Sequence, residues 1–476
     1  MVRATGRVAL GIDVGTSSVK VTAITESGRV RTASSAPYST AMPFDGAAEQ
    51  NPDDWWSAMV PATSGLLGDL IDNGARISPE TTIIGLTGQM HTSVLLGTTG
   101  EVVHPAMLWA DKRAVAECRE LMERVPSFAD ITGNVPMPAF TIAHLMWLRR
   151  HRPEAAAKLA LVLNPKDEIR RRLGAGATTE PADASGTGLF DIRSDTWSQT
   201  VMDAIQLDPG VLPSVAPSHA VSGTVRGDAG SPPLLELLAG VPVTGGGGDQ
   251  ATQAVALGVT RPGQVGLSLG TSGVVFAALA QPQPGCFRHS YEGLWLALDS
   301  THAAGLSLAW LASVTGTEVP VLTSSQAGPD DSPLFLPYLQ GHRDSLSDGR
   351  GVPGAFVGLQ AHHTREHLAY AVMEGVAFEL ARLAESLGVK GGDELRLGGG
   401  GGRSERWRGL IASAFGRPVS FADRDSSFGA AVIAAESAGW ADEFAAANSA
   451  EAVVTQPTLE LDERRTRFED ARTSLM

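Results

Sequence analysis

One short pattern occurs twice in this chain of 476 residues, once near the N-terminus and once just past the middle. Residues 12–19 read Ile-Asp-Val-Gly-Thr-Ser-Ser-Val, and residues 267–274 read Leu-Ser-Leu-Gly-Thr-Ser-Gly-Val. The Gly, Thr, Ser and Val positions coincide at one constant offset. Apolar runs on both sides of each turn predict a strand, a turn and a second strand. A chain of this length has room for two domains, so the repeat predicts two copies of one domain.

The two turns have the chemistry of a phosphate site. Their backbone N–H groups and their Thr and Ser hydroxyls can all face a phosphate. Asp13 precedes the first turn, whereas Ser268 stands at the matching position of the second. A carboxylate at such a turn can hold a hydrated Mg²⁺. An ordinary β-hairpin turn would explain either copy alone, but the repeat favours a nucleotide held between the copies.

Two glycine runs mark places where the backbone can approach a ligand closely, because glycine has no side chain. The first run, residues 245–248, ends in Asp249 at the start of a predicted helix over 251–257. A flexible turn closed by an Asp helix cap is the alternative interpretation. The second run, 398–402, follows a predicted strand and precedes a helix capped by Ser404. It lacks the GKS or GKT of a P-loop, and its strand–loop–helix pattern predicts a backbone contact with a nucleotide.

Polar side chains suited to a polyol follow a short apolar strand predicted over residues 82–86. Gln89 and His91 stand where that strand ends, which is the usual ligand edge of an α/β sheet. The Gln amide both donates and accepts hydrogen bonds, as a hydroxyl-rich ligand requires. Trp109 is a candidate flat wall for a sugar, and Asp111 lies close to it in sequence. A structural role for His91 is the alternative.

Helix signals are clear at three other places. Asn51 is expected to cap a helix over about 52–70, because Asn is a good N-cap residue and the next residue is a proline. Thr364 is expected to cap a long helix over 366–387, which carries apolar residues at helical spacing. Residues 426–431 are small and open a helix suited to close packing.

Two polar stretches receive simpler interpretations. Arg170–Arg172 are expected to be solvated charge on the surface of a helix. The stretch 341–354 has few apolar residues and could close over a site.

Charge and cysteine content exclude several classes of protein. The formal net charge of −15 argues against nucleic acid or an anionic membrane as the main partner. Cys118 and Cys286 are isolated, so they predict neither a disulfide framework nor a zinc site. No apolar run approaches the roughly 20 residues of a membrane-spanning helix, and no signal peptide is apparent. We therefore expect a soluble protein in the reducing cytoplasm.

Taken together, these stretches resemble the FGGY carbohydrate kinase family, and most of all its bacterial xylulokinase branch. The resemblance extends from residue 9 to about residue 440. Its most specific parts are Gly-Gln-Met-His at 88–91, Ile-Thr-Gly-Asn at 131–134, Gly-Gly-Gly-Asp at 246–249, Leu-Phe-Leu-Pro-Tyr-Leu at 334–339, and the residues 399–407. Each part is weak alone, but their joint order and spacing are specific.

The resemblance implies an α/β fold with two ribonuclease-H-like domains of the actin, Hsp70 and sugar kinase type, and an inter-domain catalytic cleft. A sugar-binding N-terminal domain is expected over 1–241 and an ATP-binding C-terminal domain over 242–457. A C-terminal helix over 458–476 is expected to pack back on the N-terminal domain. A homodimer is a further expectation.

The implied reaction is the phosphorylation of a ketopentose by ATP with Mg²⁺, D-xylulose to D-xylulose 5-phosphate, in xylose catabolism. Asp249 matches the family's general base, and Asp13 matches its catalytic, metal-associated aspartate. The expected sugar contacts are Gln89, Met90, His91, Trp109, Asp111 and Gln250. The expected ATP contacts are Thr16, Ser17, Gly270, Thr271, Ser272, Gly400, Gly401 and Ser404.

Three positions depart from the pattern usual in that branch. Ala110 and Gln250 stand where Asn is common. This chain also has Gly-His-Arg-Asp-Ser at 341–345, with His342 as its second residue, where the branch usually has Gly-Glu-Arg-Thr-Pro. These departures leave the reaction type unchanged and open the choice of sugar to ribulose, a deoxy sugar or glycerol. A non-catalytic, ATP-switched module of the actin or Hsp70 kind is the alternative of another class, and the Gly-Gln-Met-His stretch argues against it.

Overall fold

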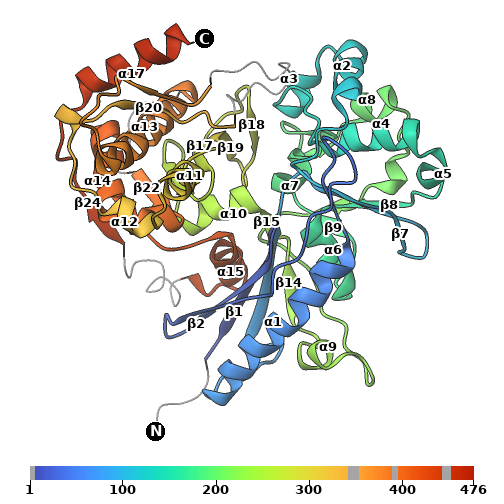
Figure 1. Ribbon diagram of the computed structural model, residues 1–476. Coiled ribbons are helices and arrows are strands. Elements are labelled where there is room, and N and C mark those ends of the chain that lie inside the picture. Colours follow the sequence, from blue (N-terminus) through green and yellow to red (C-terminus); the bar gives the residue numbers. More distant parts are fainter. Residues whose placement is uncertain (1–5, 341–352, 389–394, 442–451, 476) are drawn as a thin grey trace. The chain divides into compact units, whose positions relative to one another are not determined.

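The computed structural model describes residues 6–340, 353–388, 395–441 and 452–475 (Figure 1). The described residues form two compact units. Unit 1 takes its residues from 1–256, 280–296 and 425–450, and unit 2 from 257–279, 297–424 and 451–476. Each unit contains one of the two hairpins that the repeat predicts.

The first hairpin lies at the centre of the main sheet of unit 1. The strands of this sheet follow the order β13 (Val221–Thr224), β14 (Pro242–Thr244), β5 (Thr82–Gly88), β1 (Val8–Val14), β2 (Val19–Thr25) and β3 (Val30–Ser34), with β15 (Gly247–Gly248) also paired to β5. β1 and β2 are antiparallel, whereas β1, β14 and β15 all run parallel to β5.

The second hairpin lies at the centre of the main sheet of unit 2. The order there is β19 (Trp295–Thr301), β17 (Gly273–Leu279), β16 (Val265–Leu269), β22 (Leu395–Gly398), β23 (Val419–Phe421) and β24 (Val453–Thr455). β16 and β17 are antiparallel, and β22 and β23 continue parallel to β16. This arrangement repeats that of unit 1, with β3 matching β19, β5 matching β22 and β14 matching β23. The duplicated fold predicted from the repeat is thereby confirmed.

Alternation along β1 explains how the main sheet of unit 1 is covered on both faces. Val8, Leu10, Ile12 and Val14 belong to the core shared with α1 (Pro52–Asp72). Ala9 belongs instead to the core shared with α15 (Ser426–Ser437). A strand with a helix on each face must be buried throughout, and every residue of β1 is.

Glycine lets α15 lie directly on the backbone of β1 and β5. A Cβ added at Gly11 would lie 1.8 Å from the carbonyl oxygen of Ser427, and one at Gly85 would lie 2.0 Å from that of Ala430. Figure 1 shows α15 lying along the strands of this sheet. The prediction that the small residues at 426–431 serve close packing is confirmed.

The other elements of each unit surround its main sheet. Unit 1 has a second sheet with the strand order β4 (Glu49–Gln50), β7 (Val102–Met107), β6 (Ser93–Leu96) and β8 (Leu161–Leu163). Its other strands are β10 (Phe190–Asp191) paired with β11 (Thr196–Trp197), β12 (Ser214–Val215) paired with β9 (Thr178–Thr179), and β18 (Cys286–Arg288). Its other helices are α2 (Val115–Arg124), α3 (Phe128–Thr132), α4 (Thr141–His151), α5 (Pro153–Ala156), α6 (Pro165–Arg172), α7 (Pro181–Ser185), α8 (Gln199–Ala204), η1 (Pro209–Val211), α9 (Pro233–Leu237) and α10 (Asp249–Ala256). Unit 2 has the pair β20 (Leu334–Leu336) with β21 (Ala355–Val357), α11 (Gly305–Thr315), α12 (Val319–Thr323), η2 (Pro329–Asp331), α13 (Arg365–Ser386), η3 (Gly400–Arg403), α14 (Glu405–Phe415) and α17 (Asp462–Ser474).

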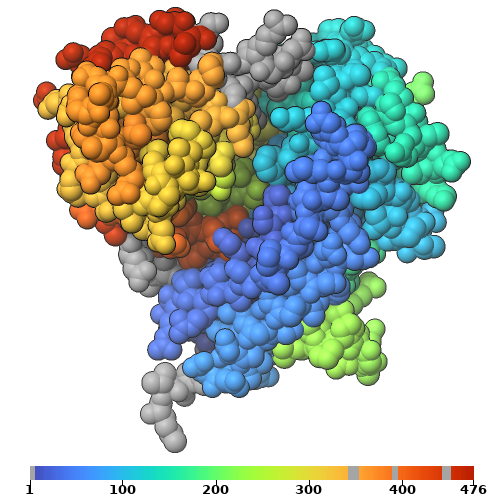
Figure 2. Space-filling view, in the orientation of Figure 1, coloured from blue at the N-terminus to red at the C-terminus, as the bar shows by residue number. Residues whose placement is uncertain are grey.

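The compact units do not follow the expected boundaries of 1–241 and 242–457. The chain returns to unit 1 for α15, because the glycines of β1 and β5 accept that helix at backbone distance. The expectation that the C-terminal helix packs on the N-terminal domain is wrong. α17 packs within unit 2, where the ring of Phe468 lies 5.5 Å from that of Phe378 of α13 and Arg464 pairs with Glu374 at 2.5 Å. The space-filling view shows α17, in red, as a surface helix of that unit (Figure 2).

Two predicted helix caps are confirmed. Asn51 caps α1 by accepting the N–H of Asp53 at 3.1 Å, and Thr364 caps α13. Cys118 and Cys286 are both free and buried. Most of the polar stretch 341–354, including His342, lies outside the described residues. In the part of the chain that the structure describes, no helix has the length and apolarity needed to cross a bilayer.

Candidate active site

Asp249 begins α10 and follows a glycine segment whose backbone is tightly enclosed. Gly246 has a φ of 75°, and a Cβ there would lie 1.9 Å from the carbonyl oxygen of Leu86. Asp249 is half-buried, and the loss of water around its carboxylate raises its pKa to about 6. Backbone hydrogen bonds from Gln250 and Met90 act in the opposite direction. The segment therefore carries a carboxylate whose pKa lies near neutrality.

Asp13 stands near the end of β1 and is buried. Ser426, at the start of α15, donates a hydrogen bond of 2.6 Å to Oδ2 of Asp13. Oδ1 is also buried and has no hydrogen-bond partner among the described residues. Burial, together with the smaller effects of the nearby charges of Asp425 and Asp249, raises the pKa of Asp13 to about 7. A buried carboxylate oxygen without a donor is suited to a cation.

Strand β5 brings the two aspartates together. Asp13 of β1 is in register with Thr87 on one side of β5, and Gly247 of β15 is in register with the same Thr87 on the other side. The three strands are parallel, so Asp13 and Asp249 lie at the carboxyl ends of the two strands that flank β5. That edge is where ligands bind in open α/β sheets.

Gln89 and Trp109 are tied to the turn of the first hairpin. The hydroxyl of Thr16 lies 3.4 Å from Oε1 of Gln89, and the indole N–H of Trp109 donates to that hydroxyl at 2.9 Å. Gln89 is buried, whereas Trp109 is 45% exposed and presents an open ring. Gln50 connects this group, because its side chain accepts from Gln89 at 3.1 Å and donates to the carbonyl of Thr16 at 2.7 Å. Ser17 is exposed at the tip of the same turn.

His91 is held in one orientation beside buried Met90. Its φ of 66° is uncommon for a residue other than glycine, and such outliers cluster at functional sites. Nδ1 lies 2.7 Å from the carbonyl oxygen of Gly186, so Nδ1 carries the proton and the lone pair of the neutral ring is on Nε2. The ring packs near Phe140 and Phe287, at centroid distances of 5.1 and 5.5 Å. An oriented acceptor of this kind suits a sugar hydroxyl.

Asp111 and Gln250 have different surroundings. Asp111 is 1% exposed, accepts from the N–H of Ala48 at 2.7 Å and pairs with the guanidinium of Arg113 at 2.7 Å. These contacts hold Asp111 in place, and its contact with the sugar stays a prediction. Gln250 lies next to Asp249 and contributes a side-chain hydrogen bond to it. Oε1 of Gln250 is buried and has no partner in the described part of the chain.

Two features of unit 1 escape prediction from the sequence. No local sequence pattern indicates Gln50, because its contacts are with Thr16 and Gln89, which lie far from it in the chain. Lys166 and Asp183 are fully buried, with Nζ of Lys166 lying 3.5 Å from Oδ2 of Asp183. A Cβ at Gly248 would lie 3.5 Å from Asp183, so this ion pair is adjacent to the glycine segment.

Thr16 and Ser17 lie in the hairpin of unit 1, whereas the other residues expected to contact ATP lie at one edge of the main sheet of unit 2. Gly270, Thr271 and Ser272 form the turn between β16 and β17, with a hydrogen bond of 2.9 Å from the N–H of Gly270 to the carbonyl of Ser272. Gly401 is adjacent, because a Cβ there would lie 2.6 Å from Leu269, the last residue of β16. Gly400 is exposed and faces open space.

Ser404 caps α14 by accepting the N–H of Trp407 at 3.2 Å, which confirms the predicted cap. The parallel strands β16 and β22 thus bring the turn and the second glycine run together. In unit 1, the parallel strands β1, β5 and β15 do the same for the first hairpin and the first glycine run. Their contact with ATP stays a prediction.

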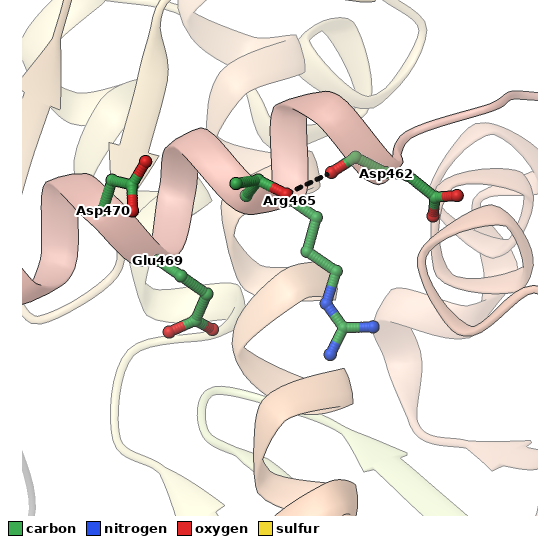
Figure 3. A pocket seen from close by; sticks show the side chains of 5 residues that line it. Asp462, Arg465, Glu469 and Asp470 are labelled. Atoms are coloured by element: carbon green, nitrogen blue, oxygen red, sulfur yellow. Dashed lines mark hydrogen bonds between the residues drawn. The ribbon is translucent and has the colours of Figure 1, made fainter.

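Two other clusters in unit 2 do not resemble a catalytic site. Five residues of α17, namely Asp462, Arg465, Thr466, Glu469 and Asp470, line a pocket of about 420 Å³. Figure 3 shows these side chains projecting from a single helix. Asp331 lies near three histidines at the start of α13, but Nδ1 of His363 and of His367 accepts a backbone N–H at 3.0 Å. The Nδ1 lone pairs of these two histidines therefore accept hydrogen bonds from the backbone and cannot bind a metal.

Comparisons with known proteins agree with the duplicated fold. Residues 8–257 match the N-terminal domain of the FGGY family of carbohydrate kinases, and residues 265–438 match its C-terminal domain. The chain is 35% identical to the xylulose kinase of Escherichia coli (strain K12) over 443 residues, which cover 89% of each protein.

Two solved structures extend this result. The crystal structure of a xyloylose kinase from Brucella ovis has a TM-score of 0.88 and 31% identity, and covers 98% of this chain and 99% of that one. The structure of Plasmodium falciparum glycerol kinase with ADP has a TM-score of 0.87 at 18% identity over 99% of each chain, a likeness of fold alone. The chain belongs to the FGGY family of carbohydrate kinases.

Proposed function

We propose that this protein transfers the γ-phosphoryl group of ATP to a hydroxyl of a ketopentose, with D-xylulose as the substrate and D-xylulose 5-phosphate as the product. The observation that carries the proposal is the pair Asp13 and Asp249 at one sheet edge of unit 1, beside Gln89, Met90 and His91. We assign the sugar to that edge and the nucleotide to the turn and glycine run of unit 2. The reaction would take place in the cytoplasm, as a step of xylose catabolism.

Asp249 has the properties of a general base for this reaction. A hydroxyl attacks a phosphoryl group well only if its proton is removed as the bond forms, and a base works best when its pKa is close to the working pH. The pKa of Asp249, raised to about 6, leaves it ionised at pH 7 and more basic than an ordinary aspartate. Gln250 and the backbone of Met90 hold the carboxylate in place.

Asp13 would hold the metal of MgATP. The buried Oδ1 without a donor fits a hydrated divalent cation, and Ser426 fixes the other carboxylate oxygen. Mg²⁺ supplies charge neutralisation at the phosphoryl oxygens. The residues of the chain then have two tasks, which are to position the sugar hydroxyl and to accept its proton.

The pH dependence of the reaction follows from the pKa of Asp249. A base with a raised pKa loses its ionised form as the pH falls through about 6, so we expect kcat/KM for the sugar to decline below that pH and to level off above it. The measurement is kcat/KM against pH at saturating MgATP. An acid limb centred near pH 4 would mean that Asp249 keeps an ordinary pKa.

The choice of sugar is the open part of the proposal. Identities of 31 to 35% to xylulose and xyloylose kinases favour D-xylulose. The likeness in fold to a glycerol kinase means that the fold alone does not select the sugar. Exposed Ala110 and the buried acceptor of Gln250 are the positions that favour a different sugar or polyol.

The test is ADP release from the purified protein with MgATP and a panel of D-xylulose, L-xylulose, D-ribulose, L-ribulose, fructose, glycerol and gluconate. We expect D-xylulose to give the highest kcat/KM. A higher value with another member would keep the phosphoryl transfer and overturn the substrate. Tight ATP binding without turnover on any member would overturn the proposed reaction and favour the ATP-switched module.

A further inference from the structure

Arg170 is fully buried, although its sequence context predicts a solvated charge. It lies on α6 in a run of three arginines, and its side chain is 0% exposed. Its neighbours keep some exposure: Arg171, 30% exposed, pairs with Glu168 at 2.7 Å, and Arg172, 17% exposed, pairs with Asp53 at 2.7 Å. The expectation is therefore wrong for Arg170, and a buried guanidinium requires an explanation.

The guanidinium of Arg170 holds the backbone that leads to Asp249. Nη2 donates to the carbonyl oxygens of Thr244 and Gly245, the latter at 3.0 Å. Nη1 donates to the hydroxyl of Ser222 on β13. These contacts join α6 and β13 to the start of the glycine segment. An arginine side chain can make them together because its five N–H groups form a rigid fork.

The glycine segment is otherwise held by its backbone, and Gly247 and Gly248 pair with β5. It has no side chains that could anchor it, and the backbone amides of Gly245 and Gly246 donate to Ala220 and Ser218 at 2.9 Å each. On the carbonyl side, Arg170 is the side chain that binds Thr244 and Gly245. The space around the run is filled, since a Cβ at Gly245 would lie 2.5 Å from the carbonyl oxygen of Pro217. A small displacement here would be transmitted to Asp249.

The electrostatics suit a role in holding carbonyl groups rather than in pairing with a carboxylate. No described carboxylate forms an ion pair with Arg170, whereas nearby Lys166 lies 2.5 Å from Asp167 and 3.7 Å from Glu180. Glu180 in turn accepts the hydroxyl of Ser218 at 3.0 Å. The buried acids thus have other partners, and Nη1 and Nη2 of Arg170 donate to Ser222 and to backbone oxygens, whereas its buried Nε has no partner among the described residues.

We propose that Arg170 is a positioning residue for Asp249, fixing the glycine segment so that the carboxylate meets the sugar hydroxyl in the geometry needed for proton transfer. This inference rests on the proposed function. A misplacement of about 1 Å can cost roughly 100-fold in rate without loss of binding. Arg170 should therefore affect kcat much more than either KM.

Three substitutions and a matched control test the inference. Arg170→Met removes all the donors, and we expect kcat to fall about 100-fold, with KM for sugar and for MgATP within about twofold of wild type. Arg170→Lys keeps the charge without the fork, and should restore part of the loss. Ser222→Ala removes one partner of the guanidinium and should lower kcat about threefold. Arg171→Met, on the same helix, should leave kcat unchanged.

Sugar binding by calorimetry and the thermal midpoint are measured for every variant, so that misfolding is recognised. A folded, sugar-binding Arg170→Met protein with kcat within twofold of wild type would overturn the inference, as would an equal loss in Arg171→Met. If Arg170→Met does not fold, Arg170→Lys and Ser222→Ala decide, and wild-type kcat in both overturns it. A wild-type protein without turnover on any sugar refutes the proposed function, and this inference with it; turnover that is insensitive to Arg170 refutes the inference alone.

Discussion

Replacing Asp249 by Ala is expected to lower kcat about 1,000-fold while leaving sugar binding nearly intact. Positioned general bases contribute roughly 100- to 10,000-fold, and Asp249 combines a place at the ligand edge of the sheet with a pKa of about 6. Asp249 begins α10 and is only half-buried, so the loss of its side chain should not unfold unit 1. The measurement is steady-state ADP release with the best sugar of the panel, together with calorimetric titration of that sugar.

Two variants make this result interpretable. Asp249→Asn keeps the shape of the side chain and cannot accept the proton, so it should lose activity as Asp249→Ala does. Asp72→Ala removes an exposed carboxylate at the end of α1 and should turn over at the wild-type rate. Turnover by Asp249→Ala within tenfold of wild type, in a protein that binds sugar, would assign the base to another group.

The parts of the fold that the sequence predicts are those with a local cause. Each hairpin is coded by two apolar runs around a Gly-Thr-Ser turn, and both form with the predicted strands. The caps at Asn51, Thr364 and Ser404 also depend on residues close in sequence, and all three are present. Repetition adds long-range information, because two copies of one hairpin predict two copies of one sheet.

The site residues that the sequence predicts also have a local cause. Asp13, Asp249, Gln89 and His91 stand at the ends of strands or in glycine turns, and β5 brings them together in unit 1. Asp111 lies in a similar stretch but forms an ion pair with Arg113. Nothing local distinguishes an aspartate that faces a ligand from one that is paired in the interior.

The misses share a different cause, which is contact between segments far apart in the chain. Arg170 reaches Thr244 and Gly245 across more than 70 residues, so a run of three arginines gives no sign that one is buried. The path of α17 depends on an ion pair between Arg464 and Glu374, 90 residues apart. Side-chain pairing over such separations is decided by the packed structure and leaves no periodic pattern in the sequence.

Replacing Gly11 by Val is expected to destabilise unit 1 by about 3 kcal/mol or more, which is a large fraction of the roughly 5–15 kcal/mol that keeps a protein folded. The added Cβ would lie 1.8 Å from the carbonyl oxygen of Ser427 and 2.7 Å from the backbone nitrogen of Ala431. Both neighbours are backbone atoms of α15, so no side-chain rotation can relieve the clash and the whole helix must move. Urea unfolding and the soluble yield measure this effect.

The same helix connects the stability of unit 1 to its chemistry. Ser426, at the first turn of α15, donates to Asp13 at 2.6 Å, so a displaced α15 would also release the carboxylate that is proposed to hold the metal. Any Gly11→Val protein that does fold should therefore need more Mg²⁺ for half-maximal turnover. Gly65→Ala is the matched control, because a Cβ at this helical glycine meets nothing within 4 Å and should stabilise α1 by up to about 1 kcal/mol. An unchanged urea midpoint in Gly11→Val would mean that α15 does not pack on β1 at backbone distance, and the contact that ties Ser426 to Asp13 would have to be abandoned with it.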